Sequence, residues 1–277
     1  MKDILVHTEN FRDWSPVVTY AAALAATLDA RLTGLYVCAS PTVMMPPYDA
    51  PGIMAELLEE VRELERDASA AGNSFATLAS QAGADKAAWQ VATGYLRSVL
   101  ERMSNWQDLL VLERPADAPW GVVSALGNIV LTAGLPCIVV PSGYREAPAL
   151  NCIALAWNGS AEAIRAIHAA LPLVVRAGRV LLLQGESRSD FSLGDLGWMP
   201  PFDISLYLKQ HGVHVEPRPL ATNENEAGAA LLDAASRLGA DLLVMGAWGR
   251  SRLSEWILGG ATHHVLSHAA MPVFMRH

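Results

Sequence analysis

The sequence predicts an α/β protein that contains two doubly wound parallel sheets. The first observation is an internal repeat: Asp108–Leu112 and Asp241–Met245 share one pattern, and each is followed by a loop, a helix-like run and an apolar segment. The second is that short apolar runs alternate with helical patterns in both halves, which is typical of βαβ crossovers. The third is that these runs are apolar almost throughout, as in strands buried on both faces.

The repeat divides the chain into two expected domains, residues 1–143 and 150–277. Both lengths are common for a single domain. The connector Ser142–Pro148 has the composition of a linker. The sequence therefore predicts two copies of one unit in tandem.

The first copy begins with a short apolar strand and an alanine-rich helix, and the same alternation continues to its end. Its expected strands are Ile4–Thr8, Leu32–Val37, Ala87–Ala92, Leu109–Leu112 and Ile138–Val140. Its expected helices are Pro16–Leu28, Met54–Gln81, Leu96–Trp106 and Ser124–Ala133.

The second copy repeats this order. Its expected strands are Cys152–Trp157, Val180–Leu183, Val213–Arg218, Leu242–Met245 and Val273–Met275. Its expected helices are Ala161–Val175, Ile204–His211, Ala227–Leu238 and Ala261–Ser267. A sheet has edge strands with unpaired backbone groups. We therefore expect the last strands of the copies, at Cys137–Pro141 and Val273–Arg276, to pair as an intramolecular pseudo-dimer.

Composition excludes several classes of protein. The 277-residue chain has a formal net charge of −8 and no run of lysine or arginine, so we expect no nucleic-acid binding through a basic surface. Cys38, Cys137 and Cys152 are scattered without a CxxC spacing, which fits a reducing cytosol and predicts a cytoplasmic protein. Residues 118–144 carry no charge, but glycines and Pro136 interrupt them, so we expect no membrane-spanning segment.

The segment Met245–Thr262 is the strongest candidate for chemistry, because it follows a buried strand and opens a helix. Gly246 and Gly249 let the backbone turn tightly and approach a ligand. At Gly259-Gly260 a helix begins, where unpaired N–H groups and the positive end of the helix dipole favour an anion. The loop also lies at the carboxyl end of a parallel strand, where open α/β sheets bind ligands.

The spacing Gly-x2-Gly-x9-Gly, formed by Gly246, Gly249 and Gly259 and followed by a helix and Pro272-Val273, resembles the universal stress protein family. The chain looks like the tandem two-domain form of that family. The resemblance implies a five-stranded domain with strand order 3-2-1-4-5, a role in the stress response, and association as a homodimer.

The resemblance also implies a nucleotide site in the second copy. In nucleotide-binding members the loop after strand four cradles the ATP phosphates, and an aspartate after strand one contacts the nucleoside. Asn158 stands at the aspartate position and can still donate and accept hydrogen bonds. Gly260 stands where Ser or Thr is usual and keeps its backbone N–H. The candidate nucleotide-binding residues are Ala156, Asn158, Gly246, Gly249, Arg250, Ser251, Gly259 and Gly260.

The first copy provides an internal control for this motif. Alignment of the repeats puts Glu113 at the position of Gly246 and Ala116 at that of Gly249. An acidic loop with side chains at these positions repels and blocks a phosphate, so we expect no nucleotide in the first copy. The net charge is −7 over residues 1–143 and −1 over 144–277. The second copy therefore repels an anionic ligand less than the first copy does.

Other candidate groups give weaker signals. His264 and His268 are four residues apart and share a helix face with metal-ligand spacing, with His263 beside them. No nearby carboxylate or cysteine completes a metal site, so we favour a solvated helix face and predict no metal. The sequence contains no nucleophile elbow, HExxH motif or Walker A loop, so no catalytic residue is predicted.

We therefore expect a stress-response protein whose second copy binds an adenine nucleotide, ATP, without fast turnover. One alternative is a nucleotide-free module for protein interaction and dimerisation. A second alternative is a slow ATPase. These hypotheses differ in whether nucleotide copurifies with the protein and whether phosphate is released.

Overall fold

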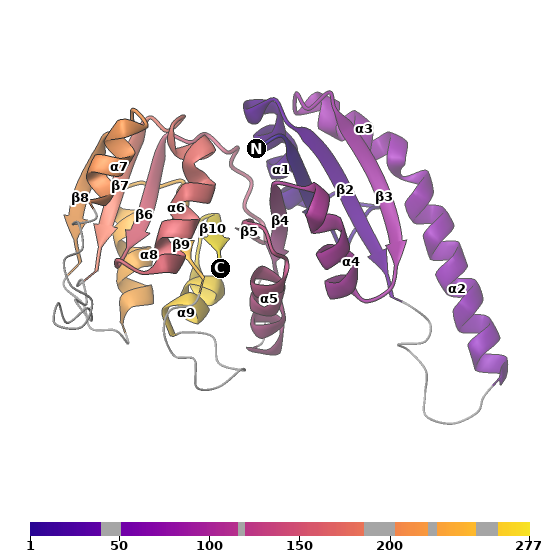
Figure 1. Cartoon of the computed structure of the whole chain (residues 1–277). Helices are drawn as coiled ribbons and strands as arrows, with labels where there is room; N and C mark the ends of the chain where they lie inside the picture. Colours follow the sequence, from indigo (N-terminus) through magenta and orange to yellow (C-terminus); the bar gives the residue numbers. More distant parts are fainter. Residues whose placement is uncertain (40–50, 116–119, 186–202, 221–225, 248–259) are drawn as a thin grey trace. The chain divides into compact units, whose positions relative to one another are not determined.

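The computed structural model describes residues 1–39, 51–115, 120–185, 203–220, 226–247 and 260–277, and for 51–54 and 120–122 it describes the backbone alone. The chain forms two compact units (Figure 1). The first unit comprises Met1–Asp117 and Asn128–Pro148, and the second comprises Ala118–Gly127 and Ala149–His277. Because 118–127 is grouped with the second unit, the domain limits expected from the sequence stay a prediction.

The first unit contains a parallel sheet with strand order β3-β2-β1-β4-β5. The strands are β1 (Asp3–His7), β2 (Arg31–Cys38), β3 (Ala87–Thr93), β4 (Leu109–Arg114) and β5 (Cys137–Pro141). Each expected strand is present, with ends shifted by one or two residues. The helices are α1 (Pro16–Leu28), α2 (Pro51–Ala70), α3 (Gly72–Gln81), α4 (Leu96–Met103) and α5 (Trp120–Thr132), and a 3₁₀ turn at Ser104–Trp106 follows α4.

The single helix expected over Met54–Gln81 is wrong, because the chain breaks it into α2 and α3. Ala71 has φ −70° and ψ −6°, so the ladder of helical hydrogen bonds is interrupted there. The break lets α3 lie on the sheet, where Phe75 is fully buried. Phe75 lies against Gly34 of β2, and a Cβ at Gly34 would come within 2.5 Å of its ring.

The second unit repeats the architecture with order β8-β7-β6-β9-β10, again all parallel. Counted within the unit, this is 3-2-1-4-5, as the resemblance implies. The strands are β6 (Cys152–Trp157), β7 (Arg179–Gln184), β8 (Val215–Pro219), β9 (Leu242–Gly246) and β10 (Val273–Arg276). The helices are α6 (Ala161–Val174), α7 (Ile204–Gln210), α8 (Ala227–Arg237) and α9 (Gly260–His268).

The strand expected at Val213–Arg218 starts two residues later than predicted. The N–H of Val213 donates to the carbonyl of Leu208 and so closes the end of α7, after Gly212 has turned the chain at φ +77°. Local hydrogen bonding of the helix end therefore takes the residues that β-propensity assigned to the strand.

The repeat extends to a specific hydrogen-bonding device. Asp108, before β4, accepts the backbone N–H groups of Lys2 at 2.5 Å and Asp3 at 3.2 Å, where β1 begins. Asp241, before β9, accepts those of Asn151 at 2.7 Å and Cys152 at 3.3 Å, where β6 begins. In each unit one carboxylate thus fixes the starts of two neighbouring strands.

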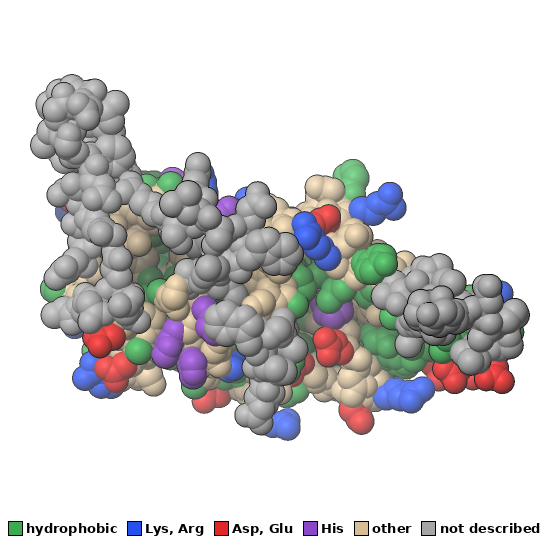
Figure 2. Space-filling view, turned by 90° about the horizontal axis from the view of Figure 1, so that it is seen from below, with side chains coloured by type: hydrophobic (Ala, Val, Ile, Leu, Met, Phe, Trp, Pro, Cys, Tyr) green, Lys and Arg blue, Asp and Glu red, His purple; other side chains and the backbone are tan. Residues whose placement is uncertain are grey.

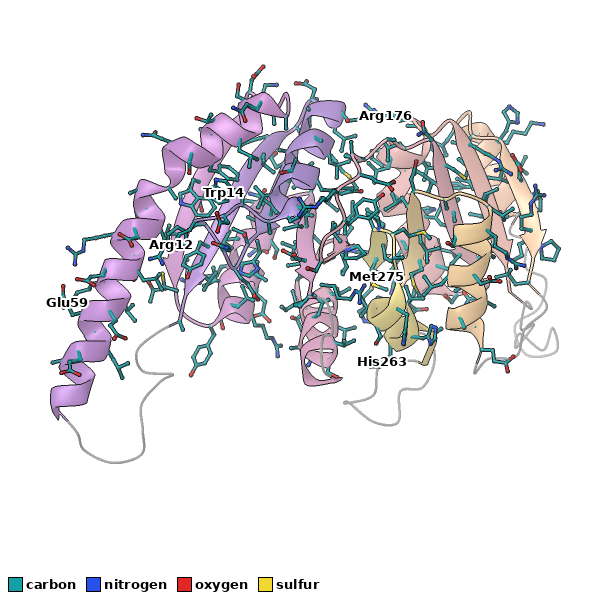
Figure 3. All side chains as sticks on the ribbon, turned by 180° about the vertical axis from the view of Figure 1, so that it is seen from behind. Arg12, Trp14, Glu59, Arg176, His263 and Met275 are labelled. Atoms are coloured by element: carbon teal, nitrogen blue, oxygen red, sulfur yellow. The ribbon has the colours of Figure 1, made fainter. Side chains whose placement is uncertain are left out.

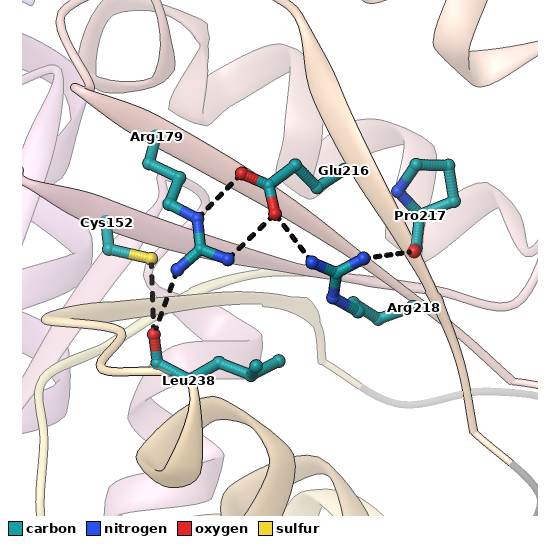
Figure 4. A network of polar contacts seen from close by, with 6 residues as sticks. All are labelled: Cys152, Arg179, Glu216, Pro217, Arg218 and Leu238. Atoms are coloured by element: carbon teal, nitrogen blue, oxygen red, sulfur yellow. Dashed lines mark hydrogen bonds and ion pairs between the residues drawn. The ribbon is translucent and has the colours of Figure 1, made fainter.

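The edge strand β8 carries an ion-pair network (Figure 4). Arg179 of β7 makes two 2.7 Å contacts to the carboxylate of Glu216, and Arg218 makes a third. Hydrogen bonding to these guanidinium groups lowers the pKa of Glu216 below its ordinary value. The network orders the side chains along this edge. No helix in the part of the chain that the structure describes is long and apolar enough to cross a membrane.

Candidate functional site

A pocket with a cavity volume of about 160 Å³ opens at the carboxyl ends of the strands in the second unit. Its walls include the ends of β6, β7 and β9. β6 and β9 are neighbours in the sheet, but the chain leaves β6 toward β7 and leaves β9 toward β10. The pocket therefore lies at the switch point of the unit, where doubly wound sheets bind ligands.

One wall of the pocket is apolar. Leu183 belongs to the end of β7, Leu220 follows β8 directly, and Leu231 comes from α8. This surface suits a flat apolar group such as a nucleobase, because small-molecule sites combine apolar walls with a few placed polar groups.

Three helix N-termini contribute the other walls. The first turn of α6 supplies Glu162 and Ala163, the start of α8 supplies Ala227, and the start of α9 supplies Ala261 and Thr262. Helix N-termini carry partial positive charge and unpaired N–H groups. Their convergence on one pocket favours a ligand that carries negative charge.

Asn158 and Ser160 shape the turn from β6 into α6. The side-chain oxygen of Asn158 accepts the N–H of Ser160 at 3.1 Å, and the Ser160 hydroxyl oxygen accepts the N–H of Ala163 at 3.2 Å. Ser160 is thus the N-cap of α6. Since its oxygen holds this turn, Asn158 presents its amide group at the pocket rim in a fixed position.

Gly246 is required by packing, because a Cβ there would come within 2.6 Å of the carbonyl carbon of Glu162 and 2.7 Å of the amide nitrogen of Ala163. The end of β9 therefore lies directly against the first turn of α6. Gly246 both lines the pocket and permits this contact. Gly260 differs, since a Cβ there would meet no atom within 4 Å.

A second close approach fixes the start of α9. A Cβ at Gly228 of α8 would lie 2.8 Å from the Cβ of His264 and 2.9 Å from the carbonyl oxygen of Ala261. The two helices cross at this glycine, so the N-terminal turn of α9 is held at the pocket wall by packing.

The same place in the first unit is filled by side chains. In the first unit His7 of β1 pairs with Leu35 of β2, and in the second unit Ala156 of β6 pairs with Leu183 of β7. His7 therefore occupies the position of Ala156, so an imidazole replaces the small side chain that lines the pocket. His7 is buried, and burial lowers its pKa from 6.5 to about 4. Glu113 of β4 stands where β9 has its glycine.

The loop after β1 packs aromatic side chains onto the sheet of the first unit. It runs from Thr8 to Ser15, whereas the second unit has three residues between β6 and α6. The buried Phe11 packs edge-on against Tyr36 at 4.9 Å between ring centroids. Trp14 packs edge-on against Trp89, with 5.1 Å between ring centroids, and lies beside α2 (Figure 3). Because side chains alternate along β2, Tyr36 faces the opposite side of the sheet from Leu35, so these contacts lie on the face away from His7.

Histidine side chains gather on the carboxyl edge of the sheet, as Figure 2 shows. On α9 the rings of His264 and His268 stack at 4.3 Å, and His268 Nδ1 lies 2.9 Å from the carbonyl oxygen of His264. Burial lowers the pKa of His263 and His264, and the neighbouring His268 lowers both further. Among the described residues no group of three or more His, Cys, Asp or Glu converges as a metal site would require.

The structure brings three of the predicted residues together and places a fourth nearby. Ala156, Asn158 and Gly246 line the pocket. Gly260 is exposed and opens α9, but it is not a lining residue. The remaining candidates, which are Gly249, Arg250, Ser251 and Gly259, lie outside the described residues.

Glu162 and the apolar wall were not among the residues predicted from the sequence. Glu162 lies two residues after the N-cap Ser160, so the first turn of the helix after strand one was the signal that could have found it. Leu183 and Leu220 carry no sequence signal of their own, since an apolar residue at a strand end is ordinary. Their role follows from the order of the strands.

Comparison with known proteins agrees with this architecture. Residues 153–277 match the model of the universal stress protein family. The universal stress protein Slr1230 of Synechocystis is 24% identical over 294 residues, which covers 99% of both chains.

Solved structures show the same fold over the whole chain. A universal stress protein from Archaeoglobus fulgidus has a TM-score of 0.71 at 16% identity, covering 99% of this chain and 96% of that one. PA1789 from Pseudomonas aeruginosa, described as functionally unknown, has a TM-score of 0.56 at 15% identity and covers 100% of this chain and 92% of its own.

Proposed function

Since residues 153–277 match the universal stress protein family, we propose that the chain belongs to that family, that its second unit binds an adenine nucleotide, ATP, and that it acts in the stress response. The observation that carries the proposal is the pocket at the switch point between β6 and β9, where an apolar wall and three helix N-termini meet. The apolar wall suits the base, and the helix N-termini suit the phosphates.

The candidate residues divide between the two ends of the ligand. Ala156 and Asn158 lie at the end of β6 and are assigned to the nucleoside. Gly246, Gly260 and the predicted loop residues Gly249, Arg250, Ser251 and Gly259 are assigned to the phosphates. Bare backbone at glycines lets N–H groups approach an anion closely.

We propose that turnover is slow or absent. Phosphoryl transfer requires groups that hold a metal ion and orient the attacking water. In the described part of the chain the pocket is lined by one carboxylate, that of Glu162, and by no histidine or lysine. We further propose that the protein is cytoplasmic, that its last strands pair as a pseudo-dimer, and that it forms a homodimer.

The test starts with the purified full-length protein. Mass spectrometry after gentle denaturation is expected to detect ATP or AMP, and calorimetric titration with ATP is expected to give saturable binding. A protein with no bound nucleotide and no heat signal supports the nucleotide-free interaction module instead. Release of phosphate above the rate without protein supports the slow ATPase.

A matched pair of variants locates the site. Ala156→His places in the second unit the side chain that fills the first, so ATP binding is expected to fall at least ten-fold. His7→Ala makes the reverse change in the first unit and is expected to leave ATP affinity unchanged. Equal effects of both variants, or binding that survives Ala156→His, contradict the assignment.

A further inference from the structure

Glu162 places a carboxylate at the pocket. It is half-buried in the first turn of α6 and lines the pocket. Its side chain makes no hydrogen bond or ion pair with any residue that the structure describes. The dipole of α6 accounts for a carboxylate in its first turn, and both carboxylate oxygens remain available to a ligand in the pocket.

Packing fixes the position of the Cβ of Glu162. The Cβ of Glu162 lies 2.8 Å from the place a Cβ would take at Gly246, so the glycine leaves room for Glu162 to stand over the end of β9. The first unit has the reverse arrangement, with Val17 at the corresponding helix position and Glu113 at the strand position. Glu162 thus depends on a glycine that the first unit lacks.

The order of the strands places Glu162 relative to the parts of a nucleotide. The apolar residues Leu183 and Leu220 lie at the ends of β7 and β8, while α9 starts after β9 on the way to β10. A base on the apolar wall and phosphates at the start of α9 therefore leave the sugar at the ends of β6 and β9. Asn158 and Glu162 are the polar side chains at that point.

Charge excludes the phosphates from direct contact with Glu162, since like charges repel. An ionised carboxylate accepts hydrogen bonds with two oxygens and donates none. It therefore selects a neutral group with two adjacent donors. The vicinal 2′- and 3′-hydroxyls of a ribose present two such donors side by side.

We propose that Glu162 determines the specificity of this site by accepting hydrogen bonds from the 2′- and 3′-hydroxyls, so that the pocket selects ribonucleotides over 2′-deoxyribonucleotides. The inference rests on the proposed binding of an adenine nucleotide. Hydrogen bonds to a charged acceptor are stronger than neutral ones, so removal of one hydroxyl is expected to weaken binding roughly ten-fold.

The experiment is calorimetric titration of the full-length protein with ATP, 2′-deoxy-ATP, 3′-deoxy-ATP and ITP, each with Mg²⁺ and with EDTA. The unaltered protein is expected to bind ATP roughly ten-fold more tightly than either deoxy form, with or without Mg²⁺. Glu162→Gln is expected to lower ATP affinity roughly three-fold, to leave the affinity for the deoxy forms nearly unchanged, and so to reduce that ratio to about three, because the neutral amide is a weaker acceptor. Glu113→Gln is the control in the first unit and is expected to leave the ratio unchanged, and melting curves check that both variants fold.

Several results overturn the inference while the proposed function stands. These are equal affinities for ATP and the deoxy forms in the unaltered protein, and an unchanged ratio in Glu162→Gln. A preference that disappears in EDTA shows that Glu162 holds a cation. A loss of discrimination against ITP, with the deoxy ratio intact, shows that it contacts the base. If the unaltered protein binds no nucleotide at all, the proposed function fails and this inference fails with it.

Discussion

Gly246 and Gly260 look alike in the sequence but face different surroundings. A Cβ at Gly246 would overlap the backbone of α6, whereas one at Gly260 would stand in open space. At least one glycine of the motif, Gly246, is therefore required by the packing of β9 against α6. Its contact with α6 is also what leaves room for Glu162.

Gly246→Ala is expected to destabilise the protein by about 1–3 kcal/mol, the usual range for inserting a methyl group into packed surroundings. Gly260→Ala is the matched control and is expected to be neutral or slightly stabilising, because alanine favours the helix. Urea unfolding of both variants measures the difference. Equal free energies of unfolding for the two would show that β9 can move away from α6 at no cost.

His7 makes the stability of the protein depend on pH. Burial lowers its pKa from 6.5 to about 4, so the folded protein resists protonation while the unfolded chain accepts a proton below about pH 6.5. Between about pH 6.5 and pH 4 the unfolded chain therefore binds a proton that the folded protein does not, so acid destabilises the folded state over this range. The loss attributable to His7 is about 2 kcal/mol between pH 7 and pH 5.

The check is urea unfolding of the unaltered protein and of His7→Gln at both pH values. The variant stays uncharged, so its free energy of unfolding is expected to fall less on acidification by about that amount. Parallel pH profiles of the two proteins would mean that His7 is already protonated, or is solvated, in the folded state.

At the scale of elements, β8 shows how an edge strand avoids pairing with another chain. The N–H of Leu220 donates to the carbonyl oxygen of Gln184 in β7. Backbone N–H groups alternate in direction along a strand, so those at positions 217 and 219 would point away from β7. Both positions are proline and have no N–H. Arg218 also donates to the carbonyl oxygen of Pro217, which covers an outward acceptor.

Replacing Pro217 and Pro219 together by valine restores two outward donors and is expected to cause association that rises with protein concentration. Light scattering after size-exclusion chromatography measures it. Arg176→Ala, a change on the surface away from this edge, serves as control. A double variant whose mass distribution matches that of the unaltered protein would show that the ion-pair network alone protects the edge.

At the scale of the whole molecule, the two units share their strand order and the aspartate that fixes the strand starts, yet differ at the pocket. Small residues line the pocket in the second unit at places where the first has His7 and Glu113. This difference is the reason why we propose a ligand site in the second unit alone.

Nucleotide binding is therefore expected to protect one unit alone. At ATP concentrations 100 times the Kd, linkage adds about 2.7 kcal/mol to the stability of the binding unit. Hydrogen exchange with and without ATP is expected to slow at the amides of β6, β9 and the start of α6, and to stay unchanged in β1 and β4. Protection in β1 and β4 of similar size would place ligand in the first unit and contradict the proposal.

Sequence patterns determined the elements well where one local signal dominates. Each strand and nearly each helix forms where the alternation of apolar runs and helical patterns predicts it, and Pro16–Leu28 is reproduced to the residue. Two failures, at Ala71 and Val213, occur because a helix break and a helix C-terminal turn depend on how neighbouring elements pack and bond. The helix expected from Ser124 also begins earlier, at Trp120.

The sequence by itself determined the repeat and the fold class and singled out the second copy as the candidate for a ligand site, because periodicity and glycine spacing are local properties of the chain. Only the tertiary structure decided that Ala156 and Gly246 line one pocket with Leu183 and Leu220, and that Glu162 lines it too. These residues come together because parallel strands from distant parts of the chain end at one edge of the sheet. The close approach at Gly246 depends on how β9 packs against α6, so neither segment of the sequence predicts it alone.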